Sequence, residues 1–359
     1  MEQSLNKGSA PVDPEPPSRP HKRRTRYPGK YPRRFDQKYK EHDPARFAAT
    51  FKRVLDSGKT PAGAHRPIMV EEVLSVLAPR PGELALDCTL GYGGHASEVL
   101  SRLQPGGRLV GLDQDPIELP KTEARLSAAG FGPESFIAVR ENFAALGQVI
   151  ARLGVTGVDM VLADLGVSSM QLDDPKRGFS LKHEGPLDMR MNPAKGRPAS
   201  VLLEVIKPGQ LKAVLAENAD EPHAELLGKS LAGHSFGTTA ALAARIRTLL
   251  SRFGQDEVQL SLRRTFQALR MTINDELSTL EALLRQLPAC LNPGARVAIL
   301  TFHSGEDRLV KQSFAAGLRA GVFAEIAPEV IRPTMVERHA NPRSSPAKLR
   351  WARAAGGAS

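Results

Sequence analysis

A short glycine-rich segment holds the residues best suited to chemistry. The apolar run Leu84–Leu86 leads to Asp87, and the chain continues Cys-Thr-Leu-Gly-Tyr-Gly-Gly-His to residue 95. A strand, a glycine turn and a helix in this order form the first nucleotide-binding loop of doubly wound α/β domains, where Gly91, Gly93 and Gly94 would let a ligand approach the main chain. Asp87 would repel a pyrophosphate and attract the ammonium and sulfonium groups of S-adenosylmethionine, so the loop favours that cofactor.

The same loop also fits a dinucleotide fingerprint. Gly91, Gly93 and Ala96 satisfy G-x-G-x-x-A, and Asp113 follows Gly91 by 22 residues, near the spacing of a ribose-binding acid. A nicotinamide-dependent dehydrogenase therefore stays open as an alternative.

Strand and helix patterns alternate along the first part of the globular sequence. Strands are predicted at residues 84–87, 108–113, 136–140 and 158–163, which indicates a parallel sheet with right-handed crossovers. Asp87, Asp113, Asn142 and Asp164 stand at the carboxyl ends of these strands, where open α/β sheets bind ligands.

The alternation stops after Leu165 and resumes later. Residues 171–265 show turn-rich and then helical segments at 210–217, 224–231 and 239–252, which predicts an inserted helical domain. A helix at 274–287, a strand at 296–302 ending before His303, and a last strand near 348–352 return to the sheet pattern. We therefore expect a discontinuous catalytic domain of residues 65–170 and 266–350, with a tail of residues 351–359.

The charge is concentrated at the two ends of the chain. Residues 1–64 carry 15 Lys or Arg against 7 Asp or Glu, residues 330–359 carry 6 against 1, and the middle is slightly acidic, within a net charge of +10. Residues 1–64 are also rich in proline, which predicts a disordered basic arm, and Tyr27, Tyr31 and Phe35 interleave with its arginines. This distribution favours a polyanion such as RNA as the partner.

Other classes of protein are disfavoured by the sequence. Its apolar runs are too short to span a bilayer, which predicts a soluble protein without membrane attachment. Cys88 and Cys290 have no zinc-type spacing, so no metal site is expected. We expect a cytoplasmic protein, and the sequence leaves the oligomeric state open.

Several motifs in a fixed order resemble the ribosomal RNA small-subunit methyltransferase H family, also called RsmH or MraW. They span about residues 65–350: Asp87-Cys-Thr-Leu-Gly-Tyr-Gly-Gly-His95, Asp113-Gln-Asp-Pro116, Asn142-Phe143, Asp164-Leu-Gly-Val-Ser-Ser169 through Asp173, Arg177-Gly-Phe-Ser180, Gly185 to Met191, Arg264 to Arg270, Asn274 to Leu277, Phe302 to Arg308, and Asn341 to Ser344 with Ala347 to Leu349. The match is weakest between residues 199 and 262, and Gly305 stands where the family commonly has leucine.

The resemblance implies a Rossmann-like class I methyltransferase sheet and S-adenosylmethionine-dependent methylation of a cytidine N4 in the decoding centre of 16S ribosomal RNA, on the small ribosomal subunit. It implies a methyl-donor site with these residues: Gly93, Gly94, His95, Asp113, Phe143, Asp164 and Gln171. Asp87 and Gly91 join this predicted site through the glycine loop.

Chemistry on a cytosine amine requires an acceptor for its proton, because the nitrogen lone pair is delocalised into the ring. Asp164 is the leading candidate, and a purely cofactor-binding role is its alternative. His303 is the second catalytic candidate, since its strand is expected beside the strand of Asp164. A non-catalytic RNA-binding or ribosome assembly protein would explain the basic ends but not the polar strand ends.

Overall fold

The computed structural model describes residues 67–181 and 183–356. Its centre is a seven-stranded sheet in the order β3-β2-β1-β4-β5-β7-β6. The first five strands are parallel, and β7 runs antiparallel to both of its neighbours. The strands are β1 (Leu84–Asp87), β2 (Arg108–Leu112), β3 (Phe136–Val139), β4 (Val158–Asp164), β5 (Leu291–Thr301), β6 (Phe323–Ile326) and β7 (Lys348–Ala354).

This sheet confirms the predicted Rossmann-like α/β class, and β5 lies next to β4 as expected. The strand β6 was not predicted. The strand β7 continues to Ala354, so the predicted tail of residues 351–359 begins inside a strand. That strand pairs with β5 along its length, which is why the chain stays ordered beyond residue 350.

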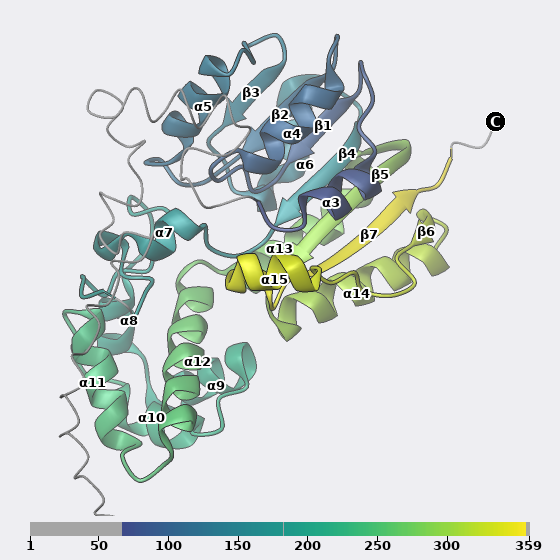
Figure 1. The fold of residues 1–359 in the computed structure, drawn as a ribbon. Helices are drawn as coiled ribbons and strands as arrows, with labels where there is room; N and C mark the ends of the chain where they lie inside the picture. The colour runs from purple at the N-terminus through teal and green to yellow at the C-terminus, as the bar shows by residue number, and fades with distance from the viewer. Residues whose placement is uncertain (1–66, 182, 357–359) are drawn as a thin grey trace, which may run out of the picture.

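Helices cover both faces of the sheet (Figure 1). On one face lie α3 (Val70–Leu77), α4 (Gly94–Leu103) and α5 (Leu119–Ala128), and on the other lie α6 (Leu146–Leu153), α13 (Glu276–Gln286) and α14 (Ser304–Arg319). Alternate residues of β4 enter the two cores: Met160 and Leu162 pack with α3 and α4, while Val161 and Ala163 pack with α6 and α13. Period-two burial of this kind fixes the strand register.

A separate helical unit follows β4 (Figure 1). Its helices are α8 (Ala199–Val205), α9 (Pro208–Ala219), α10 (Ala224–Leu231), α11 (Thr239–Leu249) and α12 (Gln255–Ile273), reached through the short α7 (Ser169–Asp173) and the 3₁₀ turn η3 (Pro175–Arg177). Leu211, Leu227, Leu242 and Leu262 pack in one core without strands, as the sequence predicts for an inserted helical region.

The helix α12 corrects one predicted boundary. It runs continuously from Gln255 to Ile273 and so crosses the predicted limit between residues 265 and 266. Leu262 and Leu269, on either side of that limit, are buried in the same helical core. Because residues on both sides of the predicted limit enter the helical core, the chain returns to the sheet only at the junction of α12 and α13.

The remaining described elements are η2 (Phe143–Ala145), η4 (Leu287–Cys290), η5 (Pro342–Ser344) and α15 (Met335–Ala340). Among the residues described, no helix is both long and apolar enough to cross a membrane. The predicted arm of residues 1–64, with Tyr27, Tyr31 and Phe35, lies outside the described part of the chain.

Candidate functional site at the carboxyl edge of the sheet

The glycine loop is held by the carboxyl groups that end two adjacent strands. Asp87 ends β1, and its Oδ1 accepts a hydrogen bond from the Thr89 backbone nitrogen at 3.0 Å. Asp113 follows β2, and its Oδ2 accepts one from the Gly91 nitrogen at 2.9 Å. Asp113 Oδ1 accepts another from Asp115 N at 2.8 Å. The two predicted cofactor residues therefore also fix the conformation of the loop.

Glycine is required at two positions of this loop. Gly93 has φ +78°, and a Cβ placed there would lie 2.8 Å from Thr122 Cγ2. A Cβ on Gly94 would lie 2.3 Å from Pro67 Cγ. The first residues of α4 can therefore pack closely against both neighbours only because side chains are absent.

Asp164 lies beside Asp87 because β4 pairs with β1. The Thr89 hydroxyl connects the two strand ends: its Oγ1 accepts from Asp164 N at 2.6 Å and donates to Asp87 Oδ1 at 3.4 Å. The Asp164 Oδ1 atom is buried and has no hydrogen-bond partner within the described residues. A buried unpaired acceptor is costly unless a ligand satisfies it.

The three carboxyl groups at this edge are unusually hard to ionise. Burial, together with the nearby charges of Asp87 and Glu306, raises the pKa of Asp164 to about 8. Burial raises the pKa of Asp87 to about 7 against the hydrogen bond from Thr89 N, with a further contribution from Asp113. Burial also raises the pKa of Asp113 to about 6. A cationic ligand would restore their ionisation, so the site fits a sulfonium and an ammonium group.

His95 faces this group of carboxyls from α4. The residue is only 7% exposed, and its Nε2 lies 3.7 Å from Asp164 Oδ2. Burial lowers the pKa of His95 to about 4, against a hydrogen bond to the Ile68 carbonyl. His95 is therefore a neutral side chain at neutral pH.

Phe143 and Gln171, two further residues of the predicted methyl-donor site, lie on different elements, η2 and α7. Phe143 is half-buried on η2, with Asn142 capping that turn through a hydrogen bond from Ala144 N at 2.8 Å. Gln171 is buried, its Nε2 donates to Asp115 Oδ2 at 2.7 Å, and its Oε1 accepts from Ser168 N. Gln171 thus orients the segment after Asp164, and its predicted contact with the donor stays a prediction.

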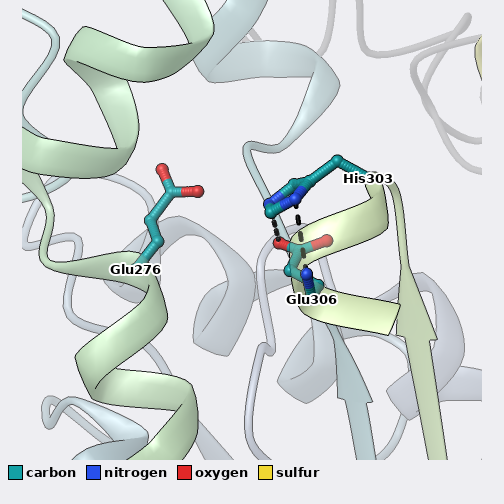
Figure 2. Close-up of side chains that lie close together, drawn as sticks. All are labelled: Glu276, His303 and Glu306. Carbon is teal, nitrogen blue, oxygen red and sulfur yellow. Dashed lines mark hydrogen bonds and ion pairs between the residues drawn. The ribbon is translucent and has the colours of Figure 1, made fainter. Parts of the chain in front are cut away.

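His303 lies at the N-terminus of α14, where its Nδ1 accepts from Glu306 N at 3.4 Å and its Nε2 lies 3.1 Å from Glu306 Oε1 (Figure 2). Glu306 Oε2 also accepts from Phe302 N at 2.8 Å. Although burial acts in the opposite sense, His303 and this bond hold the pKa of Glu306 below its usual range. Both ring nitrogens thus face one helix turn, and a catalytic role for His303 stays a prediction.

Glu276 brings a third potential metal ligand close to this pair. The carboxylates of Glu276 and Glu306 and the imidazole of His303 offer ligand atoms that lie within 4.8 Å of one another (Figure 2). However, both Glu276 oxygens bind the Arg270 guanidinium, at 2.8 and 2.7 Å. These contacts give the cluster an internal explanation, and the expectation that the protein holds no metal stays a prediction.

The sequence of this chain matches a known family over nearly all of the region that the structure describes. The match is to the MraW methylase family and covers residues 62–355. The chain belongs to the MraW methylase family. The family identity excludes the dehydrogenase alternative and makes S-adenosylmethionine the methyl donor.

Curated relatives agree with this assignment. The chain is 45% identical to ribosomal RNA small subunit methyltransferase H 1 of Lachnoclostridium phytofermentans, over 98% of this chain and 99% of that protein. It is 47% identical to ribosomal RNA small subunit methyltransferase H 2 of Alkaliphilus metalliredigens, over 92% of this chain and 97% of that protein.

Among solved structures, a SAM-dependent O-methyltransferase of Thermotoga maritima is 9% identical with a TM-score of 0.36, over 81% of this chain and 66% of that chain.

Several residues that organise this MraW site were not singled out from the sequence. Thr89 links two strand ends, and Asp115 with Arg177 forms a fully buried ion pair at 2.8 Å. Asn274 binds the segment before the helical unit, accepting from Met191 N and donating to Met189 O. Each lies within a quoted motif, but its partner is distant in sequence and no spacing indicates it.

We predict that Asp113→Asn weakens S-adenosylmethionine binding by about 1–3 kcal/mol, because one acceptor oxygen of the loop is lost in a mostly buried site. Titration calorimetry measures this. Asp159→Asn is the matched control. Asp159 also accepts two hydrogen bonds, from Leu84 N and Asn292 Nδ2, but it lies at the start of β4 and so at the other edge of the sheet from the site. If both folded variants bind S-adenosylmethionine with equal affinity, Asp113 does not belong to the binding site.

We predict that His303→Asn keeps the cap of α14, since asparagine accepts a backbone hydrogen bond there, and that turnover falls by less than about tenfold. His303→Ala removes the cap and lowers the free energy of unfolding by about 1 kcal/mol. Denaturant unfolding and single-turnover methylation measure the two effects. A turnover loss of about 10²-fold or more in a stable His303→Asn protein would establish the catalytic role.

Proposed function

We propose that the protein transfers a methyl group from S-adenosylmethionine to the exocyclic N4 of a cytidine in the decoding centre of 16S ribosomal RNA. The names of the curated relatives support methylation of small-subunit ribosomal RNA. The observation that carries the chemistry is Asp164 beside Asp87, with its Oδ1 atom buried and without a hydrogen-bond partner within the described residues. It offers an acceptor at the sheet edge where this fold binds ligands.

In this mechanism the chain binds the methyl donor, orients the target amine and accepts the proton of that amine. S-adenosylmethionine supplies an electrophilic methyl group when bound. Asp113 would accept hydrogen bonds from the ribose hydroxyls, Phe143 would pack with the adenine, and the loop at Gly93 and Gly94 would admit the methionine end. Asp164 accepts a hydrogen bond from the target amine and takes its proton as the nitrogen attacks in line.

The target base would enter beside the segment that connects β4 to the helical unit. Leu165 and Met189 are buried, and Met191 is partly buried against the helical core. Asn274 fixes the backbone of both methionines from the α12–α13 junction, at 2.8 Å to Met189 O and 2.7 Å to Met191 N. We propose that this segment lines the base pocket and that the helical unit of residues 171–273 contributes to RNA recognition.

We further propose that the substrate is the small ribosomal subunit and that the protein works in the cytoplasm. Cys88 and Cys290 are both unpaired and buried, as in proteins of reducing compartments. Membership of the MraW methylase family excludes the non-catalytic assembly protein that the sequence left as an alternative.

We predict that Asp164→Asn lowers single-turnover methylation by about 10²-fold or more, because the amide keeps the shape but accepts a proton poorly. The affinity for S-adenosylmethionine should change much less than the methylation rate does. Quench-flow methylation of small subunits at saturating donor, with calorimetry in parallel, separates the two effects. Retained methylation together with a collapse of donor affinity would mean that Asp164 only binds cofactor.

We predict that the basic arm contributes affinity for RNA and no chemistry. Deleting residues 1–60 should leave donor binding intact and make subunit binding less dependent on salt, with about 0.7–0.9 lost from the logarithmic slope per phosphate contact removed. The match to one relative covers 98% of this chain and so extends into this arm. Subunit binding across a salt series tests this, and identical slopes for both proteins would assign the arm another role.

A further inference from the structure

Two acceptor atoms face each other in the site without a hydrogen between them. His95 uses one ring nitrogen to donate to the Ile68 carbonyl, which leaves Nε2 as a lone-pair acceptor. This Nε2 lies 3.7 Å from Asp164 Oδ2, and neither Nε2 nor Asp164 Oδ1 has a hydrogen-bond partner within the described residues. His95 Nε2 and Asp164 Oδ1 are thus buried acceptor atoms without a donor, and an unpaired buried polar atom is costly.

The surroundings determine where that donor hydrogen comes from. The charges that act on Asp164 are those of Asp87 on β1 and Glu306 on α14, and both are negative. Thr89 has its hydroxyl bound to Asp87 and the Asp164 backbone, so it is already used. His303 and Arg270 lower the pKa of Glu306, and Arg270 is paired with Glu276. A proton on Asp164 Oδ2 therefore supplies His95 Nε2 with a donor in the protein without ligand.

We propose that Asp164 is protonated and donates to His95 Nε2 when no methyl donor is bound, and that the sulfonium charge of S-adenosylmethionine expels this proton. The inference rests on the proposed function, because it takes the methyl donor to bind beside Asp164. Burial raises the pKa of Asp164 to about 8, so the group is mostly protonated at pH 7 before the donor binds. A positive charge nearby stabilises the carboxylate and lowers that pKa.

The proton balance closes over one turnover. Donor binding releases the Asp164 proton to solvent and leaves a carboxylate. The amine nitrogen then forms its bond to the methyl carbon while the carbon–sulfur bond breaks, with the electron pair left on sulfur. The N–H bond breaks, its electrons stay on nitrogen, and the proton moves to Asp164. The thioether product is neutral at sulfur, so Asp164 keeps this proton and again donates to His95. Asp164 is therefore a carboxylate that can act as a base only while S-adenosylmethionine is bound.

The test is proton release on ligand binding, measured by titration calorimetry in buffers of different ionisation enthalpy. S-adenosylmethionine and S-adenosylhomocysteine differ by the methyl group and the sulfonium charge, so each is the other's control. At pH 7 we expect up to about one more proton released per bound S-adenosylmethionine, and no such difference for Asp164→Asn. Protons from Asp87 or Asp113 that both ligands displace cancel in the comparison.

Two variants of His95 separate its acceptor role from its support of Ile68. In His95→Asn a short amide can still donate to Ile68, but nothing accepts from Asp164, so the midpoint of proton release should move about half to one pH unit lower. In His95→Gln the longer side chain brings an amide oxygen towards Asp164 and should keep the midpoint nearer that of the native protein. A merely structural role would give the opposite order.

The outcomes distinguish this inference from the proposed function. Equal proton release by the two ligands in the native protein would overturn the inference while leaving donor binding intact. Failure of the native protein to bind either ligand would overturn the proposed function. If a His95 variant does not fold, the comparison of the native protein with Asp164→Asn still decides whether Asp164 holds the proton.

Discussion

Burial of several carboxyl groups at one edge of the sheet is the constraint on which the other features of the site depend. Asp87, Asp113 and Asp164 end adjacent strands, and each has its pKa raised first of all by burial. Such a group is stable in the folded chain only when it is protonated, hydrogen-bonded or matched by a cation. Thr89, Gly91 and Asp115 supply the hydrogen bonds, and a charged ligand is needed for the rest. The same arrangement that costs stability therefore creates selective affinity for a cation.

The helical unit is joined to this edge through buried polar contacts. Asp115, which follows β2, accepts from Arg177 at 2.8 Å and from Gln171 at 2.7 Å, and it is fully buried. Arg177 also donates to the carbonyls of Arg190 and Met191. A buried pair of this kind is a poor source of net stability but fixes geometry, since removing one partner leaves an uncompensated charge. The segment after Asp164 is thereby held in register with the donor loop.

Much of this arrangement could be predicted from the sequence, because it follows from local patterns. Alternating strand and helix patterns predicted the five parallel strands, and α10 has the bounds that the sequence indicated. The boundary at residue 266 was wrong because periodicity continues unchanged through α12, and only three-dimensional packing shows which core its apolar face enters. The strand β6 has four residues, too few for a clear alternation.

The chemistry of individual side chains was less predictable for a related reason. Loop motifs in the sequence identify the residues at the strand ends. The hydrogen-bond partner of each of their polar atoms, however, depends on contacts between segments that are distant in sequence. His95 was expected to bind cofactor, and only its position opposite Asp164 and its contact with Ile68 give its Nε2 a specific partner. His303 was expected near the substrate, yet both of its nitrogens face Glu306, whose negative charge in turn raises the pKa of Asp164. Glu306 lies on α14, which follows β5, and it thus influences the pKa of Asp164 at the end of the neighbouring strand β4. At this edge of the sheet, a charge on a neighbouring element therefore adds to burial and to Asp87 in raising the pKa of the candidate proton acceptor.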